Sequence, residues 1–195
     1  MANTVLVTKS FVTPFRIVFV MWLMYYIQSE GSFDLGFLGI LPRTFKGLIG
    51  IITGPLVHGT VQHLISNTVP LVFLGVVLFW FYPKIAYRIF WQSYVFTGML
   101  VWIFARSFYH IGSSGFIYAL GFFLVAYGLF VRDIRTILIS AVVVAVYGGL
   151  FSNVFILDSR VSWESHLLGA VVGVSLALIT KYLVRDATEV ESEAS

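Results

Sequence analysis

The chain has 195 residues, of which 59% are hydrophobic and only 11% are charged. A soluble globular domain carries about 25% charged residues, so this chain cannot cover a water-facing surface, and its mean hydropathy of +0.94 indicates a lipid bilayer. The absence of cysteine excludes disulfides, cysteine nucleophiles and thiolate metal sites. The net charge is only +3, and no basic run is long enough to indicate nucleic-acid binding.

Six apolar segments approach the roughly 20 residues that are needed to cross the hydrocarbon core. In chain order they are Phe11–Ile27, Leu56–Tyr82, Ile85–Phe104, Gly115–Val131, Ile134–Ile156 and Trp163–Val184. The sequence therefore predicts an all-α polytopic membrane protein with a single six-span core.

The predicted core covers residues 11–184, between an N-terminal segment at residues 1–10 and an acidic tail at residues 185–195. The first connecting loop, residues 28–57, is apolar and interrupted by Gly and Pro, which predicts short helices and turns lying in the membrane interface. The tail is poor in apolar residues, so we expect it to be disordered.

The distribution of Lys and Arg predicts the orientation in the membrane. With the N-terminus inside, the cytoplasmic side carries Lys9, Arg16, Lys84, Arg88, Arg132, Arg135, Lys181 and Arg185, whereas the outer side carries Arg43, Lys46, Arg106 and Arg160. We therefore expect a multi-pass protein of the inner cell membrane with both termini in the cytoplasm.

Polar side chains gather at one depth of the predicted bundle. His58, His63 and Asn67 fall in the first turns of the second span, Ser114 begins the fourth, and His166 lies in the first turn of the sixth. All three spans run inward from the outer face, and polar groups in lipid are costly enough to indicate function. A serine, a histidine and several hydrogen-bond donors are the components of an acyl-transfer site.

The two histidines of the second span leave an alternative open. His63 and Asn67 are four residues apart and share a helix face, whereas His58 and His63 are five apart and do not form the pair that a helical metal site prefers. No His-Glu-x-x-His motif is present, so a zinc protease is not favoured and no metal is expected. The alternative is that these histidines are interfacial residues satisfied by loop backbone.

A tight turn is predicted at Gly112-Ser113-Ser114-Gly115, where two serines compete for a nucleophilic role. Taken alone, this turn is typical of close helix packing. His110, which precedes it in a short loop, is expected to be dispensable.

Small residues follow His166 on its own helix face, at Gly169 and Gly173. Such a surface indicates close contact with another helix. We expect that contact to bring His166 within hydrogen-bonding reach of Ser114, with Tyr118 one turn below the serine.

Three spaced motifs together resemble the rhomboid family of intramembrane serine proteases. They are His58-x4-His63-x3-Asn67, Gly112-x-Ser114-Gly115-x2-Tyr118 and His166-x2-Gly169-x3-Gly173, in this order. The resemblance extends over the six-span core and implies a compact, bacterial-type bundle of six transmembrane helices. One departure is that the first loop lacks the Trp-Arg pair that many rhomboids carry.

The resemblance implies a catalytic dyad in which Ser114 is the nucleophile and His166 is its general base, with no third acidic member. Side chains of His63 and Asn67 would donate hydrogen bonds to the oxyanion. Tyr118 would pack against the ring of His166. The remaining supporting positions would be His58, which braces the loop above, and Gly112, Gly115, Gly169 and Gly173.

The implied activity is that of a serine endopeptidase that cleaves transmembrane protein substrates near the outer face of the bilayer, with no cofactor. One alternative is a catalytically silent rhomboid-like protein that binds client helices. A transporter or channel is a third possibility, but it predicts polar residues along a path through the bilayer, and the last three spans are nearly all apolar below their outer third. The natural substrate and the oligomeric state stay open.

Overall fold

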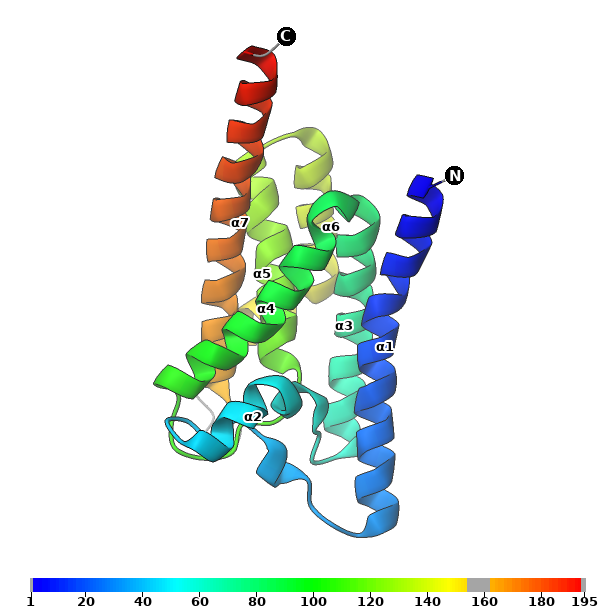
Figure 1. Ribbon diagram of the computed structural model, residues 1–195, viewed down its shortest axis with the longest axis vertical. Coiled ribbons are helices and arrows are strands. Elements are labelled where there is room, and N and C mark those ends of the chain that lie inside the picture. Colours follow the sequence, from blue (N-terminus) through cyan, green and yellow to red (C-terminus); the bar gives the residue numbers. More distant parts are fainter. Residues whose placement is uncertain (1, 154–161, 194–195) are drawn as a thin grey trace.

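The computed structural model describes residues 2–153 and 162–193, and over these residues the protein is all-α (Figure 1). Its elements are α1 (Ala2–Gly31), the short 3-10 helix η1 (Gly36–Leu38), α2 (Phe45–Thr53), the 3-10 helix η2 (Gly54–Leu56), α3 (Val61–Phe81), α4 (Pro83–Phe104), α5 (Ser114–Val131), α6 (Ile134–Asn153) and α7 (Trp163–Glu193).

Three of the described helices are both long enough and apolar enough to cross a membrane. These segments are Val61–Phe81, Ser114–Val131 and Trp163–Leu183. Two shorter apolar stretches are Phe45–Leu56 and Ile134–Gly149. Large apolar side chains are exposed along the outer faces of the helices, as expected where lipid rather than water is the solvent.

Local capping sets the ends of the helices that matter for the site. Thr60 is extended, and its Oγ1 accepts a hydrogen bond of 3.1 Å from the backbone N–H of His63. This N-cap fixes the start of α3 at the next residue, Val61. α5 ends at Val131, and the residue that caps it, Arg132, adopts a left-handed conformation with φ 63°. The carboxylate of Asp133 then accepts from the backbone N–H groups of Arg135 and Thr136 at the start of α6.

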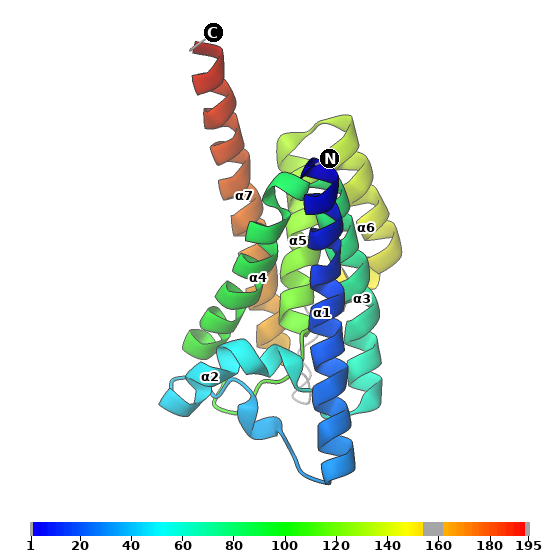
Figure 2. The same ribbon diagram turned by 45° about the vertical axis from the view of Figure 1, so that its right-hand side comes forward.

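The bundle has two different ends (Figures 1 and 2). The two termini lie at one end, and α2 lies crosswise at the other, where α3, α5 and α7 begin. α5 is central: it packs against α3, α4, α6 and, most extensively, α7. The first residues of three long helices are thereby brought to one end of the molecule.

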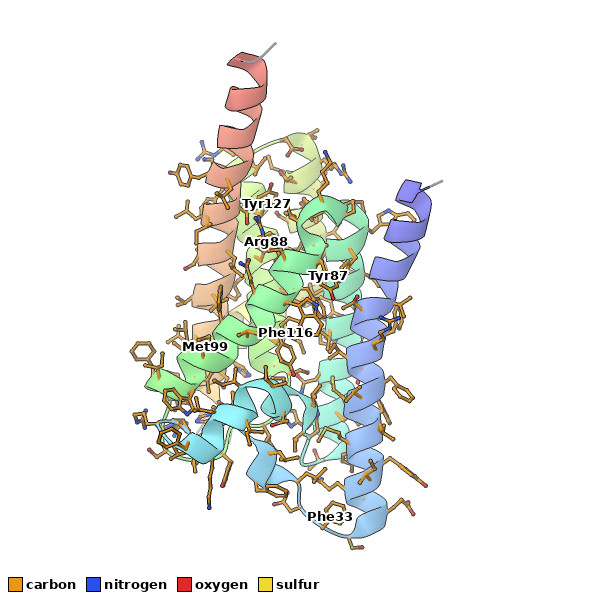
Figure 3. The ribbon with its side chains drawn as sticks, in the orientation of Figure 1. Phe33, Tyr87, Arg88, Met99, Phe116 and Tyr127 are labelled. Carbon is orange, nitrogen blue, oxygen red and sulfur yellow. The ribbon has the colours of Figure 1, made fainter. Side chains whose placement is uncertain are left out.

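Aromatic rings fill the space between α4 and α5. Phe116 of α5 lies at the centre of the bundle (Figure 3). The Phe116 ring meets Phe90 edge-on at a centroid distance of 4.8 Å and Tyr94 at 5.3 Å. Tyr94 donates its hydroxyl to the carbonyl of Ile52, which ties α4 to α2. Van der Waals packing of this kind stabilises helix contacts in lipid, where apolar burial contributes little.

Glycine lets α5 and α7 approach until their backbones touch. A Cβ built at Gly169 would lie 2.1 Å from the carbonyl oxygen of Gly115, and one built at Gly173 would lie 2.3 Å from that of Ala119. No real side chain fits at either position, because ordinary contact begins at about 3.4 Å. The spacing of the two helices is therefore set by backbone atoms.

The loop between α1 and α3 forms the predicted short helices and turns. Gly47 and Gly50 of α2 face inward, where a Cβ would lie 1.9 Å from the carbonyl oxygen of Leu41 and 2.2 Å from that of Gly39, respectively. The opposite face of α2 is exposed and apolar; it consists of Phe45, Leu48, Ile49 and Ile52.

The structure corrects two predictions. The acidic tail is not disordered as predicted: α7 continues to Glu193, because residues 186–193 contain neither Gly nor Pro and include good helix formers. His58 is not on the helix of the second span, because α3 begins only at Val61. The predicted end of the fifth span at Ile156 lies outside the described residues.

Candidate active site

A serine and a histidine meet where α5 and α7 begin. Ser114 is the first residue of α5, and His166 lies in the first turn of α7. The Oγ of Ser114 and the Nε2 of His166 are 3.0 Å apart, which is hydrogen-bonding distance. The pair lies next to the contact between Gly169 and Gly115. The distance between the two helix backbones at that contact therefore also sets the distance between these two side chains.

Tyr118 holds the plane of the histidine ring. It lies one turn after Ser114 on α5, and its ring is stacked on that of His166 with a centroid distance of 4.2 Å and an interplanar angle of 6°. A ring held in this way keeps Nε2 directed toward the serine. This is the contact that the resemblance implies for Tyr118.

The turn before Ser114 requires glycine. Gly112 has φ +96°, a conformation that other residues rarely adopt. Its backbone N–H donates to the carbonyl of Gly54 at 3.0 Å. A Cβ at Gly112 would lie 2.5 Å from Cε1 and 2.6 Å from Nε2 of His63. The absence of a side chain therefore brings the His63 ring against the turn that carries the serine.

Asn67 lies one turn below His63 and is buried. Its Nδ2 donates to the carbonyl of His63 at 2.9 Å, so one of its two amide hydrogens is used and the second is free for another acceptor. Both side chains line the cavity that contains Ser114 and His166. The structure thus brings together the four residues to which the family resemblance gives the roles of dyad and oxyanion donors.

His58 contacts the site although it lies outside α3. Its ring meets that of His63 edge-on with a centroid distance of 4.9 Å, a contact that two residues five apart on one helix could not make. Its backbone carbonyl accepts a hydrogen bond of 3.2 Å from Nε2 of Gln28, which links the loop to α1. Among the described residues, no group of three or more His, Asp or Glu is arranged to hold a metal ion.

The described residues line an open cavity of about 710 Å³ at this end of the bundle. Its wall includes Ser114, His166, His63, Asn67, Tyr118, His110 and Ser162, and on the side of α3 and α6 it includes Val69, Pro70 and Tyr147. Ser113 does not line the cavity: its Oγ is buried and has no hydrogen-bond partner among the residues that the structure describes. Of the two competing serines, only Ser114 faces a space that a substrate could enter.

The arrangement has what an acyl-transfer reaction needs. The Ser114 hydroxyl can pass its proton to His166 as it attacks a carbonyl. An oxyanion forming nearby would meet donors from His63 and Asn67, together with the backbone N–H of Ser114, which begins a helix and has no intrahelical acceptor. Glu164 is not a third member of the dyad, because its carboxylate pairs with Arg106.

Sequence reasoning did not place His110 and Ser162 in the cavity wall. The ring of His110 is buried and hydrogen-bonded to Ser162; that activity does not need His110 stays a prediction. The signal that could have found this pair is a common spacing: His110 precedes Ser114 by four residues, and Ser162 precedes His166 by four.

Comparison with known proteins assigns most of the chain to one family. The family described as the rhomboid domain matches residues 46–183. Uncharacterized proteins of Mycobacterium tuberculosis and Mycobacterium bovis are each 34% identical over 181 residues, which covers 86% of this chain and 73% of theirs. An uncharacterized protein of Mycobacterium leprae is 37% identical over 146 residues, covering 68% of this chain and 56% of its own.

Proposed function

The chain is a multi-pass membrane protein of the rhomboid family, and from that premise we propose that it is an intramembrane serine endopeptidase whose nucleophile is Ser114 and whose general base is His166. The observation that carries the proposal is the 3.0 Å separation of Ser114 Oγ and His166 Nε2 inside a cavity that also contains His63 and Asn67.

The reaction follows from these groups. His166 Nε2 accepts the proton of the Ser114 hydroxyl as Oγ forms a bond to the scissile carbonyl carbon. The protonated histidine then gives that proton to the leaving amine, and the C–N bond breaks. Water, deprotonated by the same histidine, hydrolyses the ester and frees Ser114. Because Tyr118 holds the imidazole plane, one ring orientation serves both proton transfers.

Oxyanion stabilisation is assigned to His63, Asn67 and the backbone N–H of Ser114. Removing one such donor costs roughly 3–4 kcal/mol in transition-state stabilisation when it acts alone. The contact between His63 and Gly112 supports the assignment, because it directs the ring toward the turn that holds the nucleophile.

We further propose that α1, α3, α4, α5, α6 and α7 form six membrane crossings, with both termini cytoplasmic and the cavity toward the outer face. The family resemblance implies a transmembrane substrate. A peptide bond in a transmembrane helix is inaccessible while its backbone is hydrogen-bonded, so such a substrate would have to unwind near the site. It would enter between α3 and α6. There Tyr147 has non-helical backbone angles just before Gly148 and Gly149, and its ring lies 5.2 Å from that of Phe73.

The test is labelling of the purified protein with a fluorophosphonate probe, followed by cleavage of a detergent-solubilised transmembrane substrate. We expect Ser114→Ala to abolish both, because it removes the nucleophile. Ser113→Ala is the matched control: it removes the neighbouring hydroxyl, which faces away from the cavity, and should leave turnover measurable.

Labelling that persists in Ser114→Ala but not in Ser113→Ala would contradict the assignment of the nucleophile. No labelling of a folded wild-type protein would favour the alternative, a catalytically silent member of the family that binds client helices.

A further inference from the structure

Two hydrogen bonds join the same pair of segments in the same register. Ser114 contacts His166, and four residues earlier on each segment His110 contacts Ser162, with Nδ1 of the ring 2.5 Å from the serine Oγ. The first segment is the end of the loop from α4 to α5 together with the first residue of α5, and the second is Ser162 with the first turn of α7. The catalytic contact is therefore bracketed, with the His110–Ser162 bond on one side and the backbone contact of Gly169 on the other.

The neighbours of the His110 ring determine which nitrogen carries the proton. Nε2 lies 2.9 Å from the carbonyl oxygen of Arg106, which can only accept, so Nε2 must donate. Burial lowers the pKa of His110 and so favours the neutral ring; in a neutral ring with its proton on Nε2, Nδ1 is an acceptor. Ser162 Oγ therefore donates to Nδ1 and is itself 2.6 Å from Ser165 Oγ, which can donate to it.

The rest of His110 is held as firmly as its ring. Its backbone N–H and carbonyl exchange two hydrogen bonds of 2.9 Å with Ile40 in the first loop. Phe108 stacks on the ring at a centroid distance of 4.1 Å. The charged groups that face it, Arg106 and Glu164, form an ion pair between the same loop and α7.

We propose that His110 is a positioning residue: by accepting a hydrogen bond from Ser162 while donating to the Arg106 carbonyl, it fixes the start of α7 against the loop that carries Ser114 and so keeps His166 at hydrogen-bonding distance from the nucleophile. The inference rests on the proposed protease function. His110 itself contacts neither Ser114 nor His166 in any described hydrogen bond, so it acts through Ser162 and the backbone.

Two substitutions of His110 distinguish the contribution of Nδ1 from that of Nε2. His110→Asn places an amide near the position of Nδ1 and can still accept from Ser162. His110→Gln reaches the position of Nε2 and keeps only the bond to the Arg106 carbonyl. We expect His110→Asn to stay within about threefold of wild-type kcat, and His110→Gln to lose roughly 10- to 100-fold, since a displacement of about 1 Å can cost 100-fold.

His110 and Ser162 also line the cavity, so the kinetic constants separate the two roles: loss of the positioning bond displaces the dyad and should appear in kcat, with KM within about twofold. Ser162→Ala should lower kcat as much as His110→Gln does. The double variant should lower kcat little further, since both substitutions remove the same hydrogen bond. Ser175→Ala, an exposed serine farther along α7, is the matched control and should behave as wild type. Wild-type kcat in His110→Gln, or a loss confined to KM, would overturn the proposal.

A second measurement needs no activity. The chain has only four histidines, so nitrogen-15 labelling of histidine gives a simple spectrum in which the His110 signal is the one absent from His110→Asn. We expect a neutral ring protonated at Nε2, and a change at Nδ1 in Ser162→Ala. The opposite tautomer, or a charged ring at neutral pH, would refute the positioning contact. The expected spectrum from a wild-type protein that no fluorophosphonate labels would instead refute the protease function and leave the contact standing.

Discussion

Adding a single methyl group at Gly169 should separate the dyad. Gly169→Ala introduces a Cβ that would lie 2.1 Å from the carbonyl oxygen of Gly115. That oxygen belongs to the backbone and cannot rotate away. Relief must therefore come from movement of α7 relative to α5, near the point where the two helices carry His166 and Ser114.

The size of the movement follows from the geometry. Bringing the new contact from 2.1 Å to the 3.4 Å of ordinary contact requires about 1.3 Å of separation. If this is passed on to the dyad, the 3.0 Å between Ser114 Oγ and His166 Nε2 becomes about 4 Å, which is no hydrogen bond. A misplacement of this size costs on the order of 100-fold in rate, and overpacking costs about 1–3 kcal/mol of stability.

Comparison with Gly173→Ala separates the loss of stability from the displacement of the dyad. Gly173 makes an equally close backbone contact one turn farther from His166, with a Cβ distance of 2.3 Å to the Ala119 carbonyl. We expect both variants to lower the melting temperature similarly, and Gly169→Ala to lower the rates of probe labelling and substrate cleavage more. Val171→Ile adds bulk on the exposed face of α7 and should change neither the melting temperature nor the rates of labelling and cleavage. Unchanged melting and full labelling in Gly169→Ala would refute the argument that these backbones touch.

Two further predictions concern other parts of the protein. His63→Ala and Asn67→Ala should each lower kcat more than they raise KM, and less than Ser114→Ala does, because oxyanion donors act in the transition state and overlap; steady-state kinetics showing a pure KM effect would mean that they bind substrate instead. Hydrogen bonding by Thr136 lowers the pKa of Asp133, so the cap of α6 stabilises the fold above the ordinary aspartate pKa and is lost as pH falls through the lowered value. Thermal melting should accordingly show Asp133→Ala below wild type at neutral pH and the gap closing in acid; a constant gap would contradict this.

The long helices follow from local sequence. The predicted segment Gly115–Val131 differs from α5 only at its first residue, because an uninterrupted apolar run leaves the backbone no partner except itself in lipid. Hydropathy also places Ser114 and His166 at one depth. It does not make them meet, since that depends on how closely two backbones approach. The glycines at 169 and 173 indicate that approach only when they are read together with the histidine.

Tertiary contacts account for what local sequence could not predict. The partner of His110 is 52 residues away, and no periodicity relates a loop residue to the first turn of a distant helix. His58 was misplaced because an apolar run was extended across the residues before Thr60, whose capping hydroxyl starts α3 later. The acidic tail was predicted to be disordered from its composition alone, whereas its residues up to Glu193 continue the helix α7.

The two unlike faces of α2 have a consequence for how the protein sits in a bilayer. Its glycine face rests on Leu41 and Gly39, and its outer face presents Phe45 and Ile49 to the surroundings. If α2 lies in the membrane interface, as the sequence predicts for this loop, lifting it out would expose hydrocarbon to water at roughly 25 cal/mol per Å². We therefore expect a thicker or thinner bilayer to deform around the end that carries the termini, while Ser114 keeps its depth beneath the lipid headgroups. For the protease function proposed above, membrane thickness would then help to select the peptide bond that is presented for cleavage.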